Sequence, residues 1–454
     1  MDLPPDILDQ ICFLLDAHAL RACIDAAPSL FSTLTERHLY SAINLSPRGP
    51  GNTNSPSVTL SRLQLQNLLQ EHPHVSSYIR RVCIVIRSED AVIWLSGSDT
   101  QDVDDFNIPE LPCLRTLSVD TEEHFVLKWT SIPLTLRLYW EGLVQLPSIE
   151  EVSLREIYDF PVGILDVLAT SVKQLTLYGG SQTFKMPSPT TSSIIRPVHL
   201  MLNHDHVDTI ECFKWLYHAP KNISRFSCLR TLHFRSDTRA DFILLSQLFP
   251  SCSGTLQTLT VDIAPSANTI VASTERIHSE ANGLNAVQLD LSSLHKLKKL
   301  VIYTDVTVFY CRRQILEPRT VRDLGYLSSS TARIPDIIKS AANGGPSSTL
   351  QELCIFMTFR SNGPGTPKPG PFITLANFDF GAIIEPISFM RSQFTQLAST
   401  KLAIYSTHQQ PYSEQLASLS RNPYMSPVVQ KSSWDISLTD DEWNETAVHC
   451  TATG

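Results

Sequence analysis

The densest group of side chains that could bind a metal ion lies between positions 199 and 208. This stretch reads HLMLNHDHVD and contains His199, His204, Asp205, His206 and Asp208. Imidazole and carboxylate groups are common zinc ligands, so a metal site is conceivable here. An exposed loop after a strand explains the same residues without a metal, and we favour that interpretation.

The motifs that usually carry phosphate binding, nucleophilic catalysis or zinc hydrolysis are absent: GxxxxGK[ST], GxGxxG, GxSxG and HExxH. The ten cysteines are scattered and include no C-x-x-C pair. That pattern is more typical of small buried hydrophobic residues than of a disulfide framework or zinc site. We therefore expect no enzymatic activity, no metal and no cofactor.

The charge distribution also excludes several partners. The chain has 454 residues and a net charge of −9, without a basic block, so nucleic acid is not an expected partner.

No apolar run reaches the roughly 18 residues that cross a bilayer. Asp2, Asp6 and Asp9 occupy the region where a secretory signal would carry basic residues. We expect no membrane association and a cytoplasmic or nuclear location, or both.

The first 45 residues have the period of short helices. Residues 3–15 open with two prolines and carry apolar residues at steps of one, three and four, and residues 20–27 and 30–39 repeat this spacing before the strand-like SAINLS. Helices this short are not stable alone, so they must pack together or against a partner. Turn-forming residues at 46–57 indicate a linker, and 58–71 is predicted to be a fourth helix.

A second regularity starts near position 75: an apolar residue, two variable residues, an apolar residue, one variable residue and a third apolar residue. The instances are Ile79, Val82, Ile84; Leu114, Leu117, Val119; Ile149, Val152, Leu154; Val172, Leu175, Leu177; Ile195, Val198, Leu200; Leu229, Leu232, Phe234; Leu256, Leu259, Val261; Leu297, Leu300, Ile302; and Leu350, Leu353, Ile355. Their first positions are 35, 35, 23, 23, 34, 27, 41 and 53 residues apart, and the shorter spacings lie in or near the range of leucine-rich repeats.

These repeats predict an α/β fold. The last two apolar residues of each instance share one face of a strand, and the segments between strands can return as helices. Strands repeated in one direction form a parallel sheet, so we expect an irregular solenoid with a curved parallel sheet over residues 75–405. The asparagine that usually forms a ladder beside such strands is missing. The C-terminal tail, residues 406–454, is polar and expected to be weakly ordered.

The N-terminal segments LPPDILDQICFLL, LRACIDAAPSLFSTL and RHLYSAINL together resemble an F-box over residues 1–45. Residues 46–74 then form a linker and connecting helix, and LLQEHPHVSSYIRRVCIVI at 68–86 is similar to the junction in fungal F-box proteins with leucine-rich repeats. Unlike many F-boxes, this chain has no cysteine and tryptophan pair after the second helix.

This resemblance implies a substrate-recognition subunit of a Skp-cullin-F-box type ubiquitin ligase. The residues implied to bind the Skp-type adaptor of the cullin-RING ligase are Leu3, Pro4, Ile7, Leu8, Ile11, Leu15 and Leu20. A three-helix module of this size leaves surplus apolar side chains that need a partner. The alternative is a non-ligase repeat scaffold for protein–protein interaction, whose N-terminal helices only cap the first repeat.

The target protein would bind the face between the strand leucines. Thr, Ser, Tyr, His and Arg dominate these positions, a composition suited to protein recognition. The candidate target-binding residues are Ser118, Asp120, Arg155, Tyr178, His233, Arg235 and Tyr303.

Overall fold

The computed structural model describes two compact units, residues 1–226 and 227–454, which are treated separately below. The described residues are 4–26, 28–45, 58–86, 111–121, 127–132, 134–155, 157–158, 168, 171–178, 196–203, 226–236, 239–263, 289–308, 333–361, 380–406 and 435–439.

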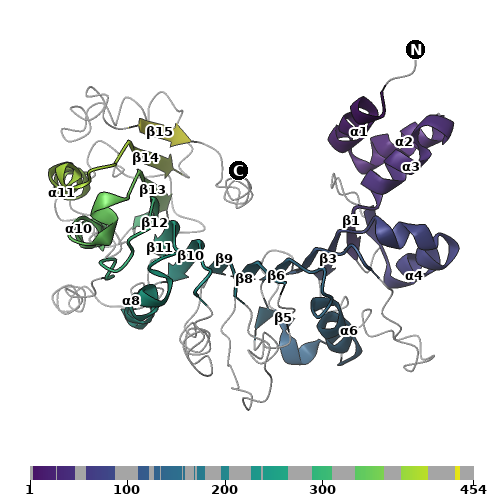
Figure 1. Cartoon of the computed structure of the whole chain (residues 1–454), viewed down its shortest axis with the longest axis horizontal. Helices are drawn as coiled ribbons and strands as arrows, with labels where there is room; N and C mark the ends of the chain where they lie inside the picture. Colours follow the sequence, from purple (N-terminus) through teal and green to yellow (C-terminus); the bar gives the residue numbers. More distant parts are fainter. Residues whose placement is uncertain are drawn as a thin grey trace, which may run out of the picture. The chain divides into compact units, whose positions relative to one another are not determined.

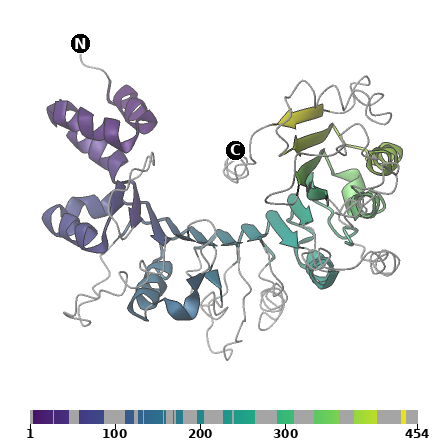
Figure 2. The same ribbon diagram turned by 180° about the vertical axis from the view of Figure 1, so that it is seen from behind.

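The first unit begins with three short helices and a strand, as predicted. These are α1 (Pro5–Leu14), α2 (Ala17–Ala26), α3 (Pro28–Leu39) and β1 (Ala42–Leu45). Figure 2 shows the three helices, in purple, as one bundle beside the first strands. Because each helix has only 10 to 12 residues, packing against its neighbours must supply most of its stability.

A parallel sheet forms the body of this unit (Figure 1). Its strands are β2 (Val58–Leu60), β3 (Arg81–Ile86), β4 (Thr116–Thr121), β6 (Glu151–Arg155), β8 (Gln174–Tyr178) and β9 (His199–Asn203), in the order β2-β1-β3-β4-β6-β8-β9. Strands β5 (Leu127–Lys128) and β7 (Ile157–Tyr158) form a separate parallel pair. The remaining elements are α4 (Arg62–Glu71), η1 (Pro73–Ser77), η2 (Trp129–Ser131) and α6 (Leu134–Val144).

Apolar side chains follow the register of this sheet. Ile43 of β1 pairs with Val82, and the row continues through Leu117, Val152, Leu175 and Leu200, all of them buried. Alternate residues bury one face of each strand, as the spacing predicted. The strand β1 of the helical module therefore extends the repeat sheet.

Two details of the prediction were wrong in this unit. The segment expected to be helical from position 58 starts with β2, because Ser61 caps α4: its Oγ accepts from the amide of Gln64 at 3.1 Å and its own amide donates to Gln64 Oε1 at 2.7 Å. The repeat placed at Ile195, Val198 and Leu200 is shifted by two residues. Leu200 pairs with Leu175, so buried Pro197 fills the turn position and Leu202 ends the pattern. Ile195 lies outside the described residues.

The second unit repeats the same plan with longer strands. They are β10 (Thr231–Ser236), β11 (Thr258–Ile263), β12 (Lys299–Val308), β13 (Glu352–Ser361), β14 (Ser399–Ser406) and β15 (Asp435–Thr439), paired in parallel in sequence order. Its helices are α8 (Arg239–Cys252), α10 (Arg333–Ala342), η7 (Gly345–Ser348), α11 (Gly381–Met390) and η9 (Arg391–Gln393). In Figure 1 α8, α10 and α11 lie on one side of the strands.

The leucine ladder covers the helix side of this second sheet. Leu232, Leu259, Leu300 and Leu353 are in register and almost fully buried. The row ends at Thr400 of β14, which is also buried. The turn residues that begin each repeat are likewise inaccessible to solvent: Leu229, Leu256, Leu297 and Leu350.

Main-chain hydrogen bonds join successive repeats, in which the usual asparagine ladder is missing. The carbonyl oxygen of Arg80 accepts from the amides of both Arg115 and Thr116, at 2.8 and 2.9 Å. The residue preceding the next strand, Arg115, does the same for Glu150 and Glu151. In the second unit Lys298 accepts from Gln351 and Glu352. The connection between repeats therefore uses backbone atoms and needs no particular side chain.

The predicted α/β architecture with parallel repeat strands is confirmed within each unit. Two strands of the second unit were not predicted. Strand β14 lies beyond the last recognised repeat, and β15 lies inside the tail for which weak order was expected. Its sequence DISLT alternates apolar and polar residues, but five residues are too few to stand out from a polar tail.

Candidate functional site: an apolar stripe on the first helix

One face of α1 leaves apolar side chains in solvent. Ile7 is 43% exposed, Ile11 38% and Leu14 81%. Their spacing of four and three residues places them in one row along the helix. Exposed Pro4 precedes this row, and its carbonyl oxygen accepts from the amide of Ile7 at 3.0 Å and of Leu8 at 3.1 Å. We call Pro4, Ile7, Ile11 and Leu14 the α1 stripe.

The opposite face of α1 packs into the module. Leu8 and Cys12 are buried, and Leu15 is half-buried one turn later. The core around Cys12 is formed by side chains of α1, α2, α3 and β2. Its members are Cys12, Leu20, Leu39 and Val58, with Leu15, Ile24, Leu34, Tyr40 and Leu60 packed against them. One face of α1 therefore packs into the core of the helical module, and the other, the α1 stripe, remains exposed.

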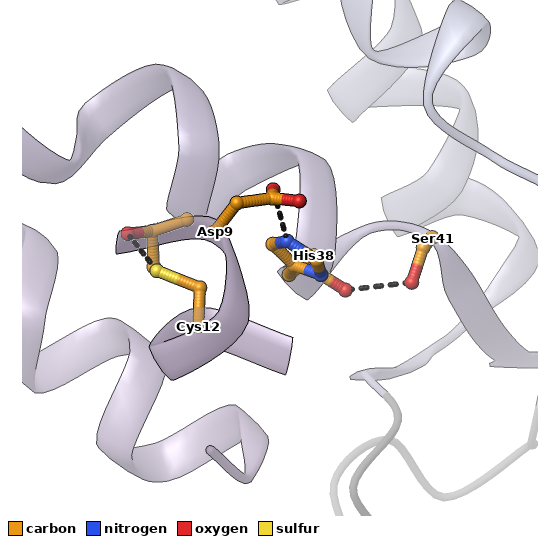
Figure 3. A network of polar contacts seen from close by, with 5 residues as sticks. Asp9, Cys12, His38 and Ser41 are labelled. Carbon is orange, nitrogen blue, oxygen red and sulfur yellow. Dashed lines mark hydrogen bonds and ion pairs between the residues drawn. The ribbon is translucent and has the colours of Figure 1, made fainter. Parts of the chain in front are cut away.

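Polar contacts fix which face of α1 turns inward (Figure 3). Asp9 Oδ1 lies 2.8 Å from His38 Nε2 on α3, and Cys12 Sγ lies 3.8 Å from Thr35 Oγ1. The Ser41 hydroxyl donates to the His38 carbonyl oxygen at 2.8 Å, at the junction with β1. The hydrogen bond from His38 lowers the pKa of Asp9, so the Asp9 carboxylate stays ionised to lower pH. These contacts hold the α1 stripe in solvent.

A second contact between a histidine and a carboxylate connects α3 to the segment before β3. His74 Nε2 of η1 lies 3.3 Å from Glu36 Oε2, and both side chains are partly exposed. The His74 ring also makes edge contacts with His72 and Tyr78. Helix α3 is therefore anchored on both sides, to α1 through His38 and to η1 through Glu36.

The structure divides the residues implied to bind an adaptor. Pro4, Ile7 and Ile11 are exposed and Leu15 is half-buried. Leu8 and Leu20 are instead buried within the module, because helical spacing alone does not tell which half of an apolar arc packs inward. Leu3 lies outside the described residues. Leu14 and Phe13, 76% exposed, were missed, although Leu14 continues the spacing of Ile7 and Ile11.

The candidate target-binding residues of the first unit lie on the strand face opposite the ladder. Ser118 and Asp120 are on β4, Arg155 ends β6 and Tyr178 ends β8. Ser118 hydrogen-bonds to Cys83 on the neighbouring strand, and burial raises the pKa of that thiol despite this bond. Thr116 donates to Glu151 Oε2 at 3.0 Å on the same face. This face offers hydroxyl and charged groups, but no reactive thiolate.

In the second unit the candidate residues interact with one another. Arg235 Nε lies 3.4 Å from Asp262 Oδ2, and His233 stacks on Tyr303 with ring centroids 6.2 Å apart. Tyr303 also stacks on Phe356 at 4.7 Å. Burial, and then the neighbouring Asp262 and Cys354, raise the pKa of Tyr303 well above its usual range, so its hydroxyl stays protonated. Phe356 was missed, although it pairs with Tyr303 and follows Ile355 as Tyr303 follows Ile302.

The histidine cluster considered as a metal site falls mostly outside the described residues, which include His199 on β9 but not His204, Asp205, His206 or Asp208. Within the described ranges no three metal-binding side chains come together. The seven cysteines placed by the structure are all unbridged, and Cys12, Cys252 and Cys354 among them are buried. None of the helices it describes combines the length and apolar character needed to span a bilayer.

The sequence was also compared with known proteins. It matches no model of a known protein family. No curated protein matches it either.

Proposed function

We propose that this protein is the substrate-recognition subunit of a Skp-cullin-F-box type ubiquitin ligase. The N-terminal helices would bind a Skp-type adaptor, and the repeat sheets, as an irregular leucine-rich-repeat solenoid, would bind the protein to be ubiquitinated. The cytoplasm, the nucleus or both would be the site of action. The α1 stripe is the observation that carries this proposal.

The stripe favours a protein partner on energetic grounds. Single apolar side chains are common on protein surfaces, but a contiguous row of them is typical of an interaction site. Burying one Ile or Leu side chain contributes roughly 1.5 to 3 kcal/mol. A groove that covers Ile7, Ile11 and Leu14 would gain this energy only for the part of each side chain that is still exposed, 43%, 38% and 81%, and the three contributions together favour α1 as the anchor of a complex.

The proposed mechanism is proximity. A chain that holds the ligase at one end and a target on its repeat sheets raises the effective concentration of a target lysine near the conjugating enzyme. No catalytic group of this protein is needed for such a step, and neither Cys83 nor Cys252 is suited to one. Burial raises the pKa of both thiols, to about 12 for Cys252.

A repeat scaffold without a ligase is the second candidate, and one observation favours it. Strand β1 pairs with both β2 and β3, and Val58 of β2 belongs to the core of the helical module. The helices thus close the end of a sheet, as the cap of a solenoid does. Only the first proposal requires that the α1 stripe bind something.

Co-purification of the full chain with a Skp-type adaptor tests the proposal. The variant Ile7→Asp plus Ile11→Asp changes exposed side chains only, so it should fold and lose at least about tenfold in adaptor recovery. A matched control, Leu138→Asp plus Phe389→Asp, places the same charges on exposed apolar side chains of α6 and α11, which are 54% and 77% accessible. This control should recover adaptor normally.

Circular dichroism of both variants verifies folding before the recoveries are compared. Equal recovery of adaptor by the wild type and the α1 variant would contradict the ligase proposal. A wild-type chain that recovers no adaptor at all would also contradict it, and would leave the scaffold as the better explanation.

A further inference from the structure

Three exposed arginines lie together at the start of neighbouring strands in the first unit. Arg80 immediately precedes β3, Arg81 is its first residue, and Arg115 immediately precedes β4. The amide of Arg115 donates to the Arg80 carbonyl oxygen at 2.8 Å, so these two residues occupy equivalent positions on adjacent strands. Adjacent strands are about 4.8 Å apart. The backbone therefore forces two guanidinium-bearing side chains to start close together.

This arrangement is unfavourable for the isolated chain. Like charges at equivalent positions of neighbouring strands destabilise a sheet. Among the described residues, no ion pair involves Arg80, Arg81 or Arg115, and Glu150, which follows Arg115 directly in the same row, is paired with Lys173 at 3.3 Å.

One carboxylate does interact with Arg80 at longer range. The Arg80 charge helps to lower the pKa of Asp9, but the largest effect on that carboxylate comes from His38, to which it is hydrogen-bonded at 2.8 Å. Asp9 is thus committed to α3. The two acids beside this pair of arginines, Asp9 and Glu150, are therefore each paired with another residue.

We infer that Arg80 and Arg115 form a binding surface for an acidic helix of a partner protein. Guanidinium groups bind carboxylates through two parallel hydrogen bonds. Carboxylates three or four residues apart on a helix start about 5 to 6 Å from one another, close to the strand spacing of Arg80 and Arg115. Side chains on one face of an extended peptide are about 6.6 Å apart and fit this spacing less well.

This surface is separate from the α1 stripe and does not depend on the proposed ligase. Arg80 and Arg115 immediately precede the strands β3 and β4, whereas the stripe belongs to the first helix. A chain with Ile7→Asp plus Ile11→Asp should therefore still bind an acidic helix, and a chain with altered arginines should still recover an adaptor. The two proposals can fail independently.

Fluorescence anisotropy with the full chain tests the inference. The probe is a fluorescein-labelled, alanine-rich helical peptide with glutamates repeated at three- and four-residue spacing. It should bind, and binding should weaken as salt is raised. Arg80→Ser plus Arg115→Ser should weaken binding about five- to tenfold, the loss of two exposed ion pairs. The control Arg230→Ser plus Lys298→Ser, at equivalent strand positions that are separated by Gln257, should leave the affinity unchanged.

Two further peptides define the outcomes that overturn the inference. A glutamine version of the probe should not bind, and equal binding of the two versions would show that carboxylates are not recognised. A version with phosphoserines in place of glutamates should bind no more than moderately better. Binding of the phosphoserine peptide alone, or unchanged binding of glutamate peptide by the Arg80→Ser plus Arg115→Ser chain, would contradict the assignment.

Discussion

Two ten-residue helices of this protein differ in the exposure of their isoleucine side chains. Helix α1, PDILDQICFL, leaves Ile7 and Ile11 in solvent. Helix α10, RIPDIIKSAA, buries Ile334, Ile337 and Ile338 completely or nearly so. Both have an acidic residue near the start and isoleucines at helical spacing. The difference therefore does not come from the helices but from what surrounds them.

Helix α10 has partners on all of its apolar positions. It packs against α11, and its Ser340 hydroxyl accepts the amide of Leu291 at 2.8 Å from the turn before β12. Helix α1 is held by α3 on one side only, through Asp9 and Cys12. Isoleucine side chains thus belong to the protein's own core in α10 and remain partly exposed in α1.

The largest effect expected from this contrast is on stability. Ile338→Ala removes a side chain with no solvent exposure and should lower the free energy of unfolding by about 2 to 5 kcal/mol. Urea unfolding followed by circular dichroism measures it. A loss below the effect of an ordinary surface substitution would show that α10 is less firmly packed than its burial indicates.

A smaller loss is expected when the polar anchor of α10 is removed. Ser340→Ala leaves the buried amide of Leu291 without its acceptor and should cost about 1 to 3 kcal/mol. The matched control is Ser246→Ala, whose hydroxyl accepts the exposed amide of Asp290 at 2.9 Å; water can replace that bond. Equal losses in the two variants would contradict the role given to burial.

The contact between Asp9 and His38, which holds α1 against α3, should make the stability of the protein depend on pH. Because the folded-state pKa of Asp9 is lowered by His38, its carboxylate stabilises the fold above the unfolded pKa of about 3.9. This stabilisation is lost as the pH falls through the folded-state pKa. Thermal unfolding of wild type and Asp9→Asn should therefore differ at pH 6 and converge in strong acid. A difference that persists unchanged at low pH would exclude the ion pair as its source.

The smallest effect is expected at the α1 stripe. Ile7→Ala plus Ile11→Ala removes side chains that lie outside the buried core, at 43% and 38% exposure, so the unfolding free energy should change by no more than about 0.5 kcal/mol for each position. The same urea titration measures it. A loss comparable to that of Ile338→Ala would show that the stripe belongs to the protein's own core, and the contrast between the two helices would disappear.

The repeat pattern predicted most of the fold because it reflects burial directly. The residues that begin the repeats in the turn before each strand, such as Ile79, Leu114 and Leu297, are buried as expected. Strand β14 escaped because buried Thr400 occupies the position of Leu353 in the register. A search for three apolar residues cannot detect a repeat whose middle member is polar.

The candidate site was harder to predict than the sheet. Residues 7, 8, 11, 14 and 15 form one broad apolar arc on a helix, and periodicity alone cannot divide it. The division follows from contacts made far away in sequence, between Asp9 and His38 and between Cys12 and Thr35. The stacking of His233, Tyr303 and Phe356 likewise depends on strand register, which local sequence does not reveal.

The doubly accepting carbonyl at the start of each strand has an evolutionary consequence. Where a repeat protein relies on an asparagine ladder, selection must preserve that residue in every copy. Here the carbonyl oxygens of Arg80, Arg115 and Lys298 perform the connection, and a carbonyl is present whatever the side chain. A change of side chain at these positions then leaves the connection between repeats intact, and an architecture of this kind can persist while its sequence diverges.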